Sequence, residues 1–236
     1  MNIIDIVIIV ILILGFLVGS SRGFTKQLVS CLGFIVTVVL AFILKNPVSE
    51  FLYEHLPFFD FLGIFNGITI LNILLYEVIA FLLVLAILNI IWRILLTATS
   101  IFEKFLEATI ILGIPSKILG GILGILENYV LIFIALYILS LPFFDIKVVD
   151  EARFKDPIIN QTPILSSLTL DNFKVIDEFK LLKDKYEVTT DTEQFNLEAL
   201  DLLLKYDIIT VESAQTLVDK GKLKMNNVDV IIKKYS

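Results

Sequence analysis

Four long apolar stretches dominate the first part of this sequence. They cover about residues 3–20, 28–44, 70–91 and 118–141. A bilayer core about 30 Å thick requires roughly 20 consecutive apolar residues in a helix, so each stretch is close to the length of a transmembrane helix. Backbone polar groups in lipid must be hydrogen-bonded internally, which also favours helices. We therefore predict an all-α polytopic membrane protein with four transmembrane helices.

Charge divides the chain into two parts. The first 141 residues hold 14 charged side chains, whereas the remaining 95 residues hold 30. This contrast predicts a transmembrane domain over residues 1–141, a linker of extended character over 142–170 and a small soluble tail over 171–236. The tail is expected to be helical because apolar residues recur there at intervals of three or four, as at Ile176 and Phe179.

The segment between the third and fourth apolar stretches is amphipathic. Across residues 94–112, apolar side chains such as Ile101 and Phe105 recur at helical spacing, with Glu103 and Lys104 between them. This pattern predicts an amphipathic interfacial helix that lies on the membrane surface. The alternative is that the segment prolongs the third transmembrane helix beyond the membrane.

Positive charges in the short connections predict the orientation of the chain. The connection between the second and third stretches contains a single basic residue, Lys45. The connections after the first and third stretches instead carry Arg22, Lys26, Arg93, Lys104 and Lys117. Because Lys and Arg are enriched on the cytoplasmic side, these two connections are predicted to be cytoplasmic in a multi-pass plasma-membrane protein. The N-terminus and the C-terminal tail are then extracytoplasmic.

Composition and motifs exclude several classes of protein. The net charge of −6 and the absence of a basic stripe argue against binding to nucleic acid. Cys31 and His55 are the only cysteine and histidine, so neither an intrachain disulfide nor a Cys/His metal cluster can form. No catalytic-triad or phosphate-loop motif is present. We therefore predict no enzymatic activity, no catalytic residues, no cofactor and no metal site.

Two carboxylates lie deep in the predicted transmembrane helices. Glu77 and Glu127 lie seven and nine residues into the third and fourth stretches, or about 10 and 14 Å from the respective helix ends. A charge at mid-membrane costs about 2.5–3.5 kcal/mol unless it is protonated or paired. The two groups could face each other as a proton- or ion-linked site or as a polar seam. Alternatively, each is protonated and hydrogen-bonded to a neighbour such as Asn128 or Asn89.

Other polar residues lie near the predicted membrane borders. Asp5 is close to the outer end of the first helix, where the helix dipole favours a carboxylate; it is a further candidate functional residue. Asn89 and Arg93 are one turn apart near the inner end of the third helix, at the predicted level of Arg22. These three residues predict either a polar cluster at the cytoplasmic face or simple anchoring by snorkelling.

Glycines recur at intervals of four in two of the apolar stretches. They are Gly15, Gly19 and Gly23 in and after the first stretch, and Gly120 and Gly124 in the fourth. Small residues at this spacing allow helix backbones to approach closely in lipid. We predict that they pack helices, by dimerisation of two copies, by a tight crossing within one chain, or by ordinary packing in the bundle.

Several of these features resemble the colicin V production protein (CvpA) family. They are Asp5 near the start of the first stretch, the Arg-Gly-Phe turn at residues 22–24, and the glycine-rich entry into the last stretch at residues 113–124. The resemblance covers about residues 1–141. It implies an integral plasma-membrane protein linked to bacteriocin production or export and to envelope homeostasis.

Two functional hypotheses follow. In the first, the protein is not an enzyme and supports toxin production, secretion or envelope homeostasis through contacts of its tail with a membrane or envelope protein. In the second, it is a small oligomeric transporter or channel that uses Glu77 and Glu127, with copies associating through the glycine faces. Both hypotheses require the lipid bilayer, and the second also requires a homo-oligomer.

Overall fold

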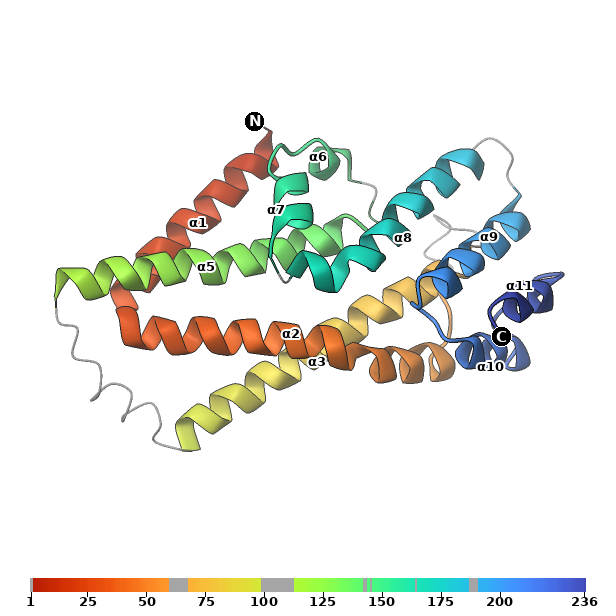
Figure 1. Ribbon diagram of the computed structural model, residues 1–236, viewed down its shortest axis with the longest axis horizontal. Coiled ribbons are helices and arrows are strands. Elements are labelled where there is room, and N and C mark those ends of the chain that lie inside the picture. Colours follow the sequence, from red (N-terminus) through yellow and green to blue (C-terminus); the bar gives the residue numbers. More distant parts are fainter. Residues whose placement is uncertain are drawn as a thin grey trace. The chain divides into compact units, whose positions relative to one another are not determined.

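The computed structural model describes residues 2–59, 68–98, 113–141, 144, 146–163, 165–186 and 191–236. Across these ranges every regular element is a helix and no strand occurs, which confirms the predicted all-α class (Figure 1). The helices are α1 (Ile3–Arg22), α2 (Phe24–His55), α3 (Leu71–Ala98), α5 (Ile114–Leu139), α6 (Lys147–Asp150), α7 (Lys155–Gln161), α8 (Leu165–Tyr186), α9 (Thr192–Lys205), α10 (Val211–Asp219) and α11 (Val228–Lys234).

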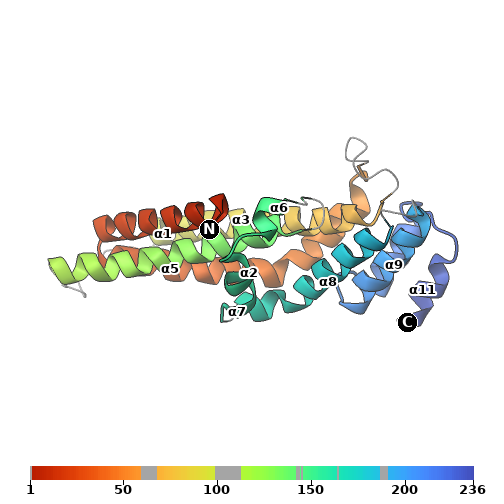
Figure 2. The same ribbon diagram turned by 90° about the horizontal axis from the view of Figure 1, so that it is seen from above.

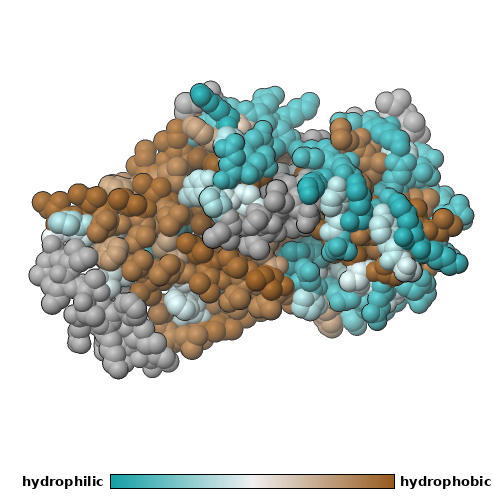
Figure 3. Space-filling model, viewed as in Figure 1, coloured by the Kyte–Doolittle hydropathy of each residue, from teal (hydrophilic) through white to brown (hydrophobic). Residues whose placement is uncertain are grey.

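Four helices are long and apolar enough to cross a membrane, as predicted: α1, α2, α3 and α5. Their apolar side chains remain exposed along much of their length, as at Ile13 and Leu17, which is expected where lipid is the solvent. Figure 3 shows hydrophobic residues over α1 and α5 and mainly hydrophilic residues over α9 to α11.

The helices extend beyond the apolar stretches. Helix α2 continues through Pro47 to His55, so Lys45 and His55, which were expected in a connection, are helical. Helix α3 continues to Ala98, and residues 94–98 therefore prolong it. Most of the predicted interfacial helix, residues 99–112, lies outside the described residues.

The chain divides into two compact units. The first comprises Met1–Ile43 and Leu83–Ser166, and the second comprises Leu44–Leu82 and Ser167–Ser236. This division differs from the predicted one at residues 141 and 171. The reason is that one end of α2 and one end of α3 pack with the tail helices, whereas the opposite ends pack with α1 and α5.

Within the first unit, glycines on α1 and α5 form a tight crossing (Figures 1 and 2). A Cβ atom built on Gly15 would lie 2.6 Å from the carbonyl oxygen of Gly124, and one on Gly120 would lie 2.5 Å from that of Gly19. These separations are too short for real side chains, so the crossing requires glycine. Among the predicted packing modes, the structure therefore shows the tight crossing within one chain.

Gly23 ends α1 and turns the chain into α2. Its φ of +79° lies in the region that glycine adopts at little cost. The N–H of Phe24 then donates to Ser116 Oγ at 3.1 Å, which attaches the start of α2 to the start of α5. Gly23 also lies against Gly120, so it combines the roles of turn and close contact.

The segment after α5 is more helical than predicted. Helices α6 and α7 lie within the expected linker, and α8 already begins at Leu165, so an extended character is wrong for residues 147–150 and 155–161. Pro157 lies in the first turn of α7, where its missing N–H costs no intrahelical hydrogen bond. Helix α7 ends before Pro163, and the hydroxyls of Thr162 and Tyr129 lie 2.7 Å apart, which connects this end of α7 to α5.

The tail helices of the second unit share an apolar core. Its largest fully buried side chains are Phe179, Leu200, Leu203, Ile209 and Leu217. Helix α9 starts with a side-chain cap, because Asp191 Oδ1 accepts a hydrogen bond from the Gln194 N–H at 3.0 Å. The amphipathic spacing seen in the sequence thus corresponds to a helical tail with a buried interior.

A carboxylate on α8 makes the stability of the tail depend on pH. Glu178 accepts hydrogen bonds from the Tyr206 hydroxyl and from Lys205 Nζ, and mainly the Tyr206 bond lowers the pKa of Glu178 below its ordinary value of 4.5, against the effect of burial. A lowered folded pKa gives stability that is complete above the unfolded pKa and is lost as the pH falls through the folded pKa. We expect amide hydrogen exchange in α8 and α9 to accelerate below about pH 4, beyond the intrinsic pH dependence of exchange, and Glu178→Gln to reduce this acceleration. Equal acceleration in both proteins would contradict the prediction.

Candidate functional site

Glu127 forms a polar seam between α5 and α2 in the first unit. Its carboxylate accepts hydrogen bonds from Gln27 Nε2 at 2.5 Å and from Ser30 Oγ at 3.1 Å. The expected neighbours have other partners: Asn128 Nδ2 donates to the Gly124 carbonyl at 2.9 Å, and Asn89 bonds within its own helix. The hydrogen-bonding partners of Glu127 are therefore residues of α2 and not the asparagines that the sequence suggested.

A pocket of about 690 Å³ lies beside this seam and is bounded by α1, α2, α3 and α5. Its polar lining consists of Arg22, Lys26, Ser30, Asn89, Arg93, Glu127 and Asn128. The structure thus brings together the three residues of the predicted polar cluster, Arg22, Asn89 and Arg93. It adds Lys26 and connects the cluster to Glu127, which the sequence treated as a separate feature.

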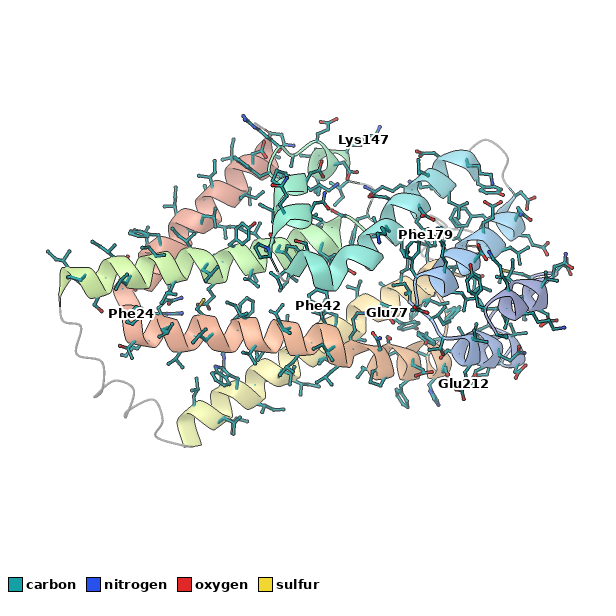
Figure 4. All side chains as sticks on the ribbon, viewed as in Figure 1. Phe24, Phe42, Glu77, Lys147, Phe179 and Glu212 are labelled. Atoms are coloured by element: carbon teal, nitrogen blue, oxygen red, sulfur yellow. The ribbon has the colours of Figure 1, made fainter. Side chains whose placement is uncertain are left out.

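Glu77 has a different environment, in the second unit (Figure 4). Its carboxylate forms a buried ion pair with Lys45 and accepts a hydrogen bond from Ser49, both on α2. Lys45 Nζ also donates to Asn46 Oδ1 at 3.1 Å. Opposite charges therefore neutralise each other inside this unit, and Glu77 joins α3 to α2.

The two membrane carboxylates have separate partners. Glu127 is held by Gln27 and Ser30 in the first unit, and Glu77 by Lys45 and Ser49 in the second. These contacts account for each carboxylate without the other. The structure therefore shows two polar connections between helices, one in each unit.

Asp5 has a structural role at the start of α1. Its carboxylate accepts hydrogen bonds from the backbone N–H groups of Asn2 at 2.8 Å and Phe154 at 3.2 Å. Asn2 in turn caps α1 and donates through Nδ2 to the Val148 carbonyl at 2.7 Å. These contacts support the interpretation of Asp5 as a helix-start carboxylate, and they fix the beginning of α1 to the segment after α5.

The remaining reactive side chains do not assemble into a metal site among the described residues. No group of three or more His, Cys, Asp or Glu side chains in those ranges could hold an ion. Cys31 is buried, and the His55 ring stacks on Phe51 with the ring centroids 4.4 Å apart. The chemistry of the described chain is therefore concentrated in the two polar connections and the pocket.

Sequence reasoning missed Gln27, Ser30 and Lys45 as partners of the carboxylates. One signal was available for the first two, because Gln27 and Ser30 are three residues apart and therefore share a face of α2. Lys45 follows directly after an apolar stretch, so hydropathy alone assigned it to a connection. Trp92 was also missed; it lines the pocket and packs against Gly33.

Comparisons with known proteins agree with this architecture. A family model described as colicin V production protein matches residues 4–163. The chain is also 32% identical over 177 residues to a Bacillus subtilis (strain 168) protein described as uncharacterized transmembrane protein YshB. The match covers 70% of this chain and 93% of the Bacillus protein. No solved structure matches the chain significantly.

Proposed function

Because this chain is a multi-pass membrane protein that belongs to the colicin V production protein family, we propose that it supports toxin production or secretion, or envelope homeostasis, by binding a partner protein. The partner is a membrane or envelope protein, and no catalysis is involved. The protein lies in the plasma membrane with both its N-terminus and its tail extracytoplasmic. The observation that carries the proposal is the attachment of the tail to the ends of two transmembrane helices.

Lys222 makes the central contact of this attachment. Its Nζ donates to the backbone carbonyls of Tyr53 at 2.6 Å, Glu54 at 2.7 Å and Leu56 at 2.8 Å. The last carbonyls of a helix have no intrahelical partner, and a lysine side chain can satisfy them while it complements the helix dipole. A residue of the tail thus caps the C-terminus of α2.

Three more contacts hold the tail helices within the second unit. Ser213 of α10 donates to Glu50 of α2, and Asn196 Oδ1 of α9 accepts the N–H of Ile70 at 3.3 Å. Lys220 pairs with Glu54 at 3.0 Å. A tail that served only as a flexible extension would not need this set of contacts, so the tail is suited to present a fixed surface to a partner.

Complementation of a strain that lacks the gene, under detergent stress, tests the proposal. Lys222→Glu places a carboxylate against the α2 carbonyls and should release the tail, so we expect normal membrane levels but failed rescue. Glu127→Gln should rescue as well as wild type. The matched control is Lys234→Glu, which removes an ion pair with Asp201 inside the tail. Full rescue by Lys222→Glu, together with a tail newly sensitive to protease, would exclude the proposal.

A second candidate function is a small oligomeric transporter or channel. The pocket beside Glu127 favours it, because polar side chains inside the membrane often mark ion or substrate pathways. The ion pair of Glu77 with Lys45 weighs against a role for Glu77. In proteoliposomes under a pH gradient, this function requires a flux that Glu127→Gln abolishes, and the absence of flux would count against it.

A further inference from the structure

We propose that the pocket of the first unit binds a phosphate group at the membrane border. We call it the cationic pocket, because Arg22, Lys26 and Arg93 line it. These cations come from the end of α1, the start of α2 and the later part of α3. Only the folded arrangement of three helices brings these cations around one cavity. The volume of the cavity is within the range typical of ligand sites.

The side chains that line the cationic pocket favour an anion. Three cations and one carboxylate, Glu127, line the same space. Glu127 is already bound by Gln27 and Ser30. Bidentate guanidinium groups and a lysine ammonium are the donors that recognise phosphate oxygens in proteins.

A buried glutamine links the cations to the carboxylate. Gln27 is only 1% exposed. Its Oε1 accepts a hydrogen bond from Arg22 Nη1 at 3.4 Å, while its Nε2 donates to Glu127 Oε2 at 2.5 Å. The chain Arg22–Gln27–Glu127 orients the amide and connects the guanidinium at the end of α1 to the carboxylate on α5. An anion therefore belongs near Arg22, away from Glu127.

The position of the pocket identifies where the phosphate can come from. Arg22 and Lys26 flank the turn between the first two spans, and Ser30 lies about 6 Å beyond Lys26 along α2. Phosphates of lipid headgroups occupy this level, and basic pockets between transmembrane helices are suited to bind them. The pocket also has an apolar wall, formed by Val29, Phe34, Leu96 and Leu131. The bound phosphate group can therefore belong to an anionic lipid headgroup or be free phosphate from the aqueous side.

The chain carries its own reporter for binding. Trp92 is the only tryptophan in the sequence and lines the cationic pocket. Its Nε1 is buried and has no hydrogen-bond partner in the part of the chain that the structure describes. Intrinsic fluorescence therefore reports directly on this pocket, without a label.

The experiment uses the full-length protein in two arms. In the first, inorganic phosphate is titrated into protein in neutral detergent. In the second, the protein is reconstituted into vesicles of phosphatidylcholine alone or of equal parts phosphatidylcholine and phosphatidylglycerol. A saturable shift of Trp92 emission with inorganic phosphate identifies free phosphate as the ligand. A shift confined to the phosphatidylglycerol vesicles identifies a lipid headgroup. No shift in either arm overturns the proposal.

Charge-neutral variants show whether the shift comes from the pocket. Arg22→Gln and Arg93→Gln should each weaken binding by about tenfold, because each removes a charge-assisted hydrogen bond. Lys117→Gln is the matched control, because Lys117 is an exposed cation on α5 that does not line the pocket. Equal binding by the arginine variants, with unchanged size-exclusion profiles, would also overturn the proposal, as would an equal loss in the control.

Discussion

Replacing Gly19 or Gly124 with leucine is expected to separate α1 from α5. A Cβ atom on Gly19 would lie 2.9 Å from Gly124 Cα, and one on Gly124 would lie 3.0 Å from Gly19 Cα. These obstacles are backbone atoms, so no side-chain rotation can relieve them. Overpacking of this kind costs about 3 kcal/mol or more, which corresponds to a fall in melting temperature of roughly 6–12 °C.

Heating in detergent followed by size-exclusion chromatography measures this fall. The control is Ala86→Leu, which introduces the same residue at an exposed position of α3 in the first unit. We expect the control to melt like wild type. If Gly124→Leu melted like the control, the close crossing of α1 and α5 would be wrong.

Removing Lys45 is expected to destabilise the second unit strongly. The Lys45 and Glu77 side chains are only 11% and 9% exposed. Breaking a buried ion pair leaves an uncompensated charge and costs about 3–5 kcal/mol. Lys45→Met should therefore lower the melting temperature far more than Lys220→Met, which breaks the more exposed pair with Glu54 and should cost about 1 kcal/mol or less.

A double variant separates charge from packing at this pair. Lys45→Met with Glu77→Met removes both charges, and apolar replacements of buried pairs are often neutral or stabilising. Ser49 keeps a partner, because the Asn46 carbonyl lies 2.8 Å from its hydroxyl oxygen and can accept the hydroxyl hydrogen once Glu77 is replaced. We therefore expect the double variant to recover most of the lost stability. A double variant as unstable as Lys45→Met would show that the ion pair is not the cause.

The sequence was sufficient for the four transmembrane helices, because their apolar length is a local property of the chain. It also contained the glycine spacing, although the choice between dimerisation and an internal crossing depended on which helix faces Gly19. That choice depends on tertiary packing between residues about a hundred positions apart, such as Gly19 and Gly120. Hydropathy carries no information about such pairs.

The partners of the polar groups were less predictable for the same reason. Lys45 lies directly after an apolar stretch, and only the continuation of α2 through Pro47 places it opposite Glu77. The helical segments at 147–150 and 155–161 are short, and the nearby Pro157 and Pro163 suggested extended chain. Arg22, Asn89 and Arg93 were grouped by their predicted depth, which is a one-dimensional property. The pocket that joins them with Lys26 required the arrangement of the helices.

The glycine crossing also bears on the order in which the first unit assembles during synthesis. Helix α1 ends at Arg22, whereas its partner glycines are at positions 120 and 124. At ribosomal rates of about 5–20 residues per second, roughly 5–20 s of translation separate the two helices. During this interval the face of α1 that carries its glycines contacts lipid or other helices. The glycine crossing can therefore form only after both α2 and α3 have been made.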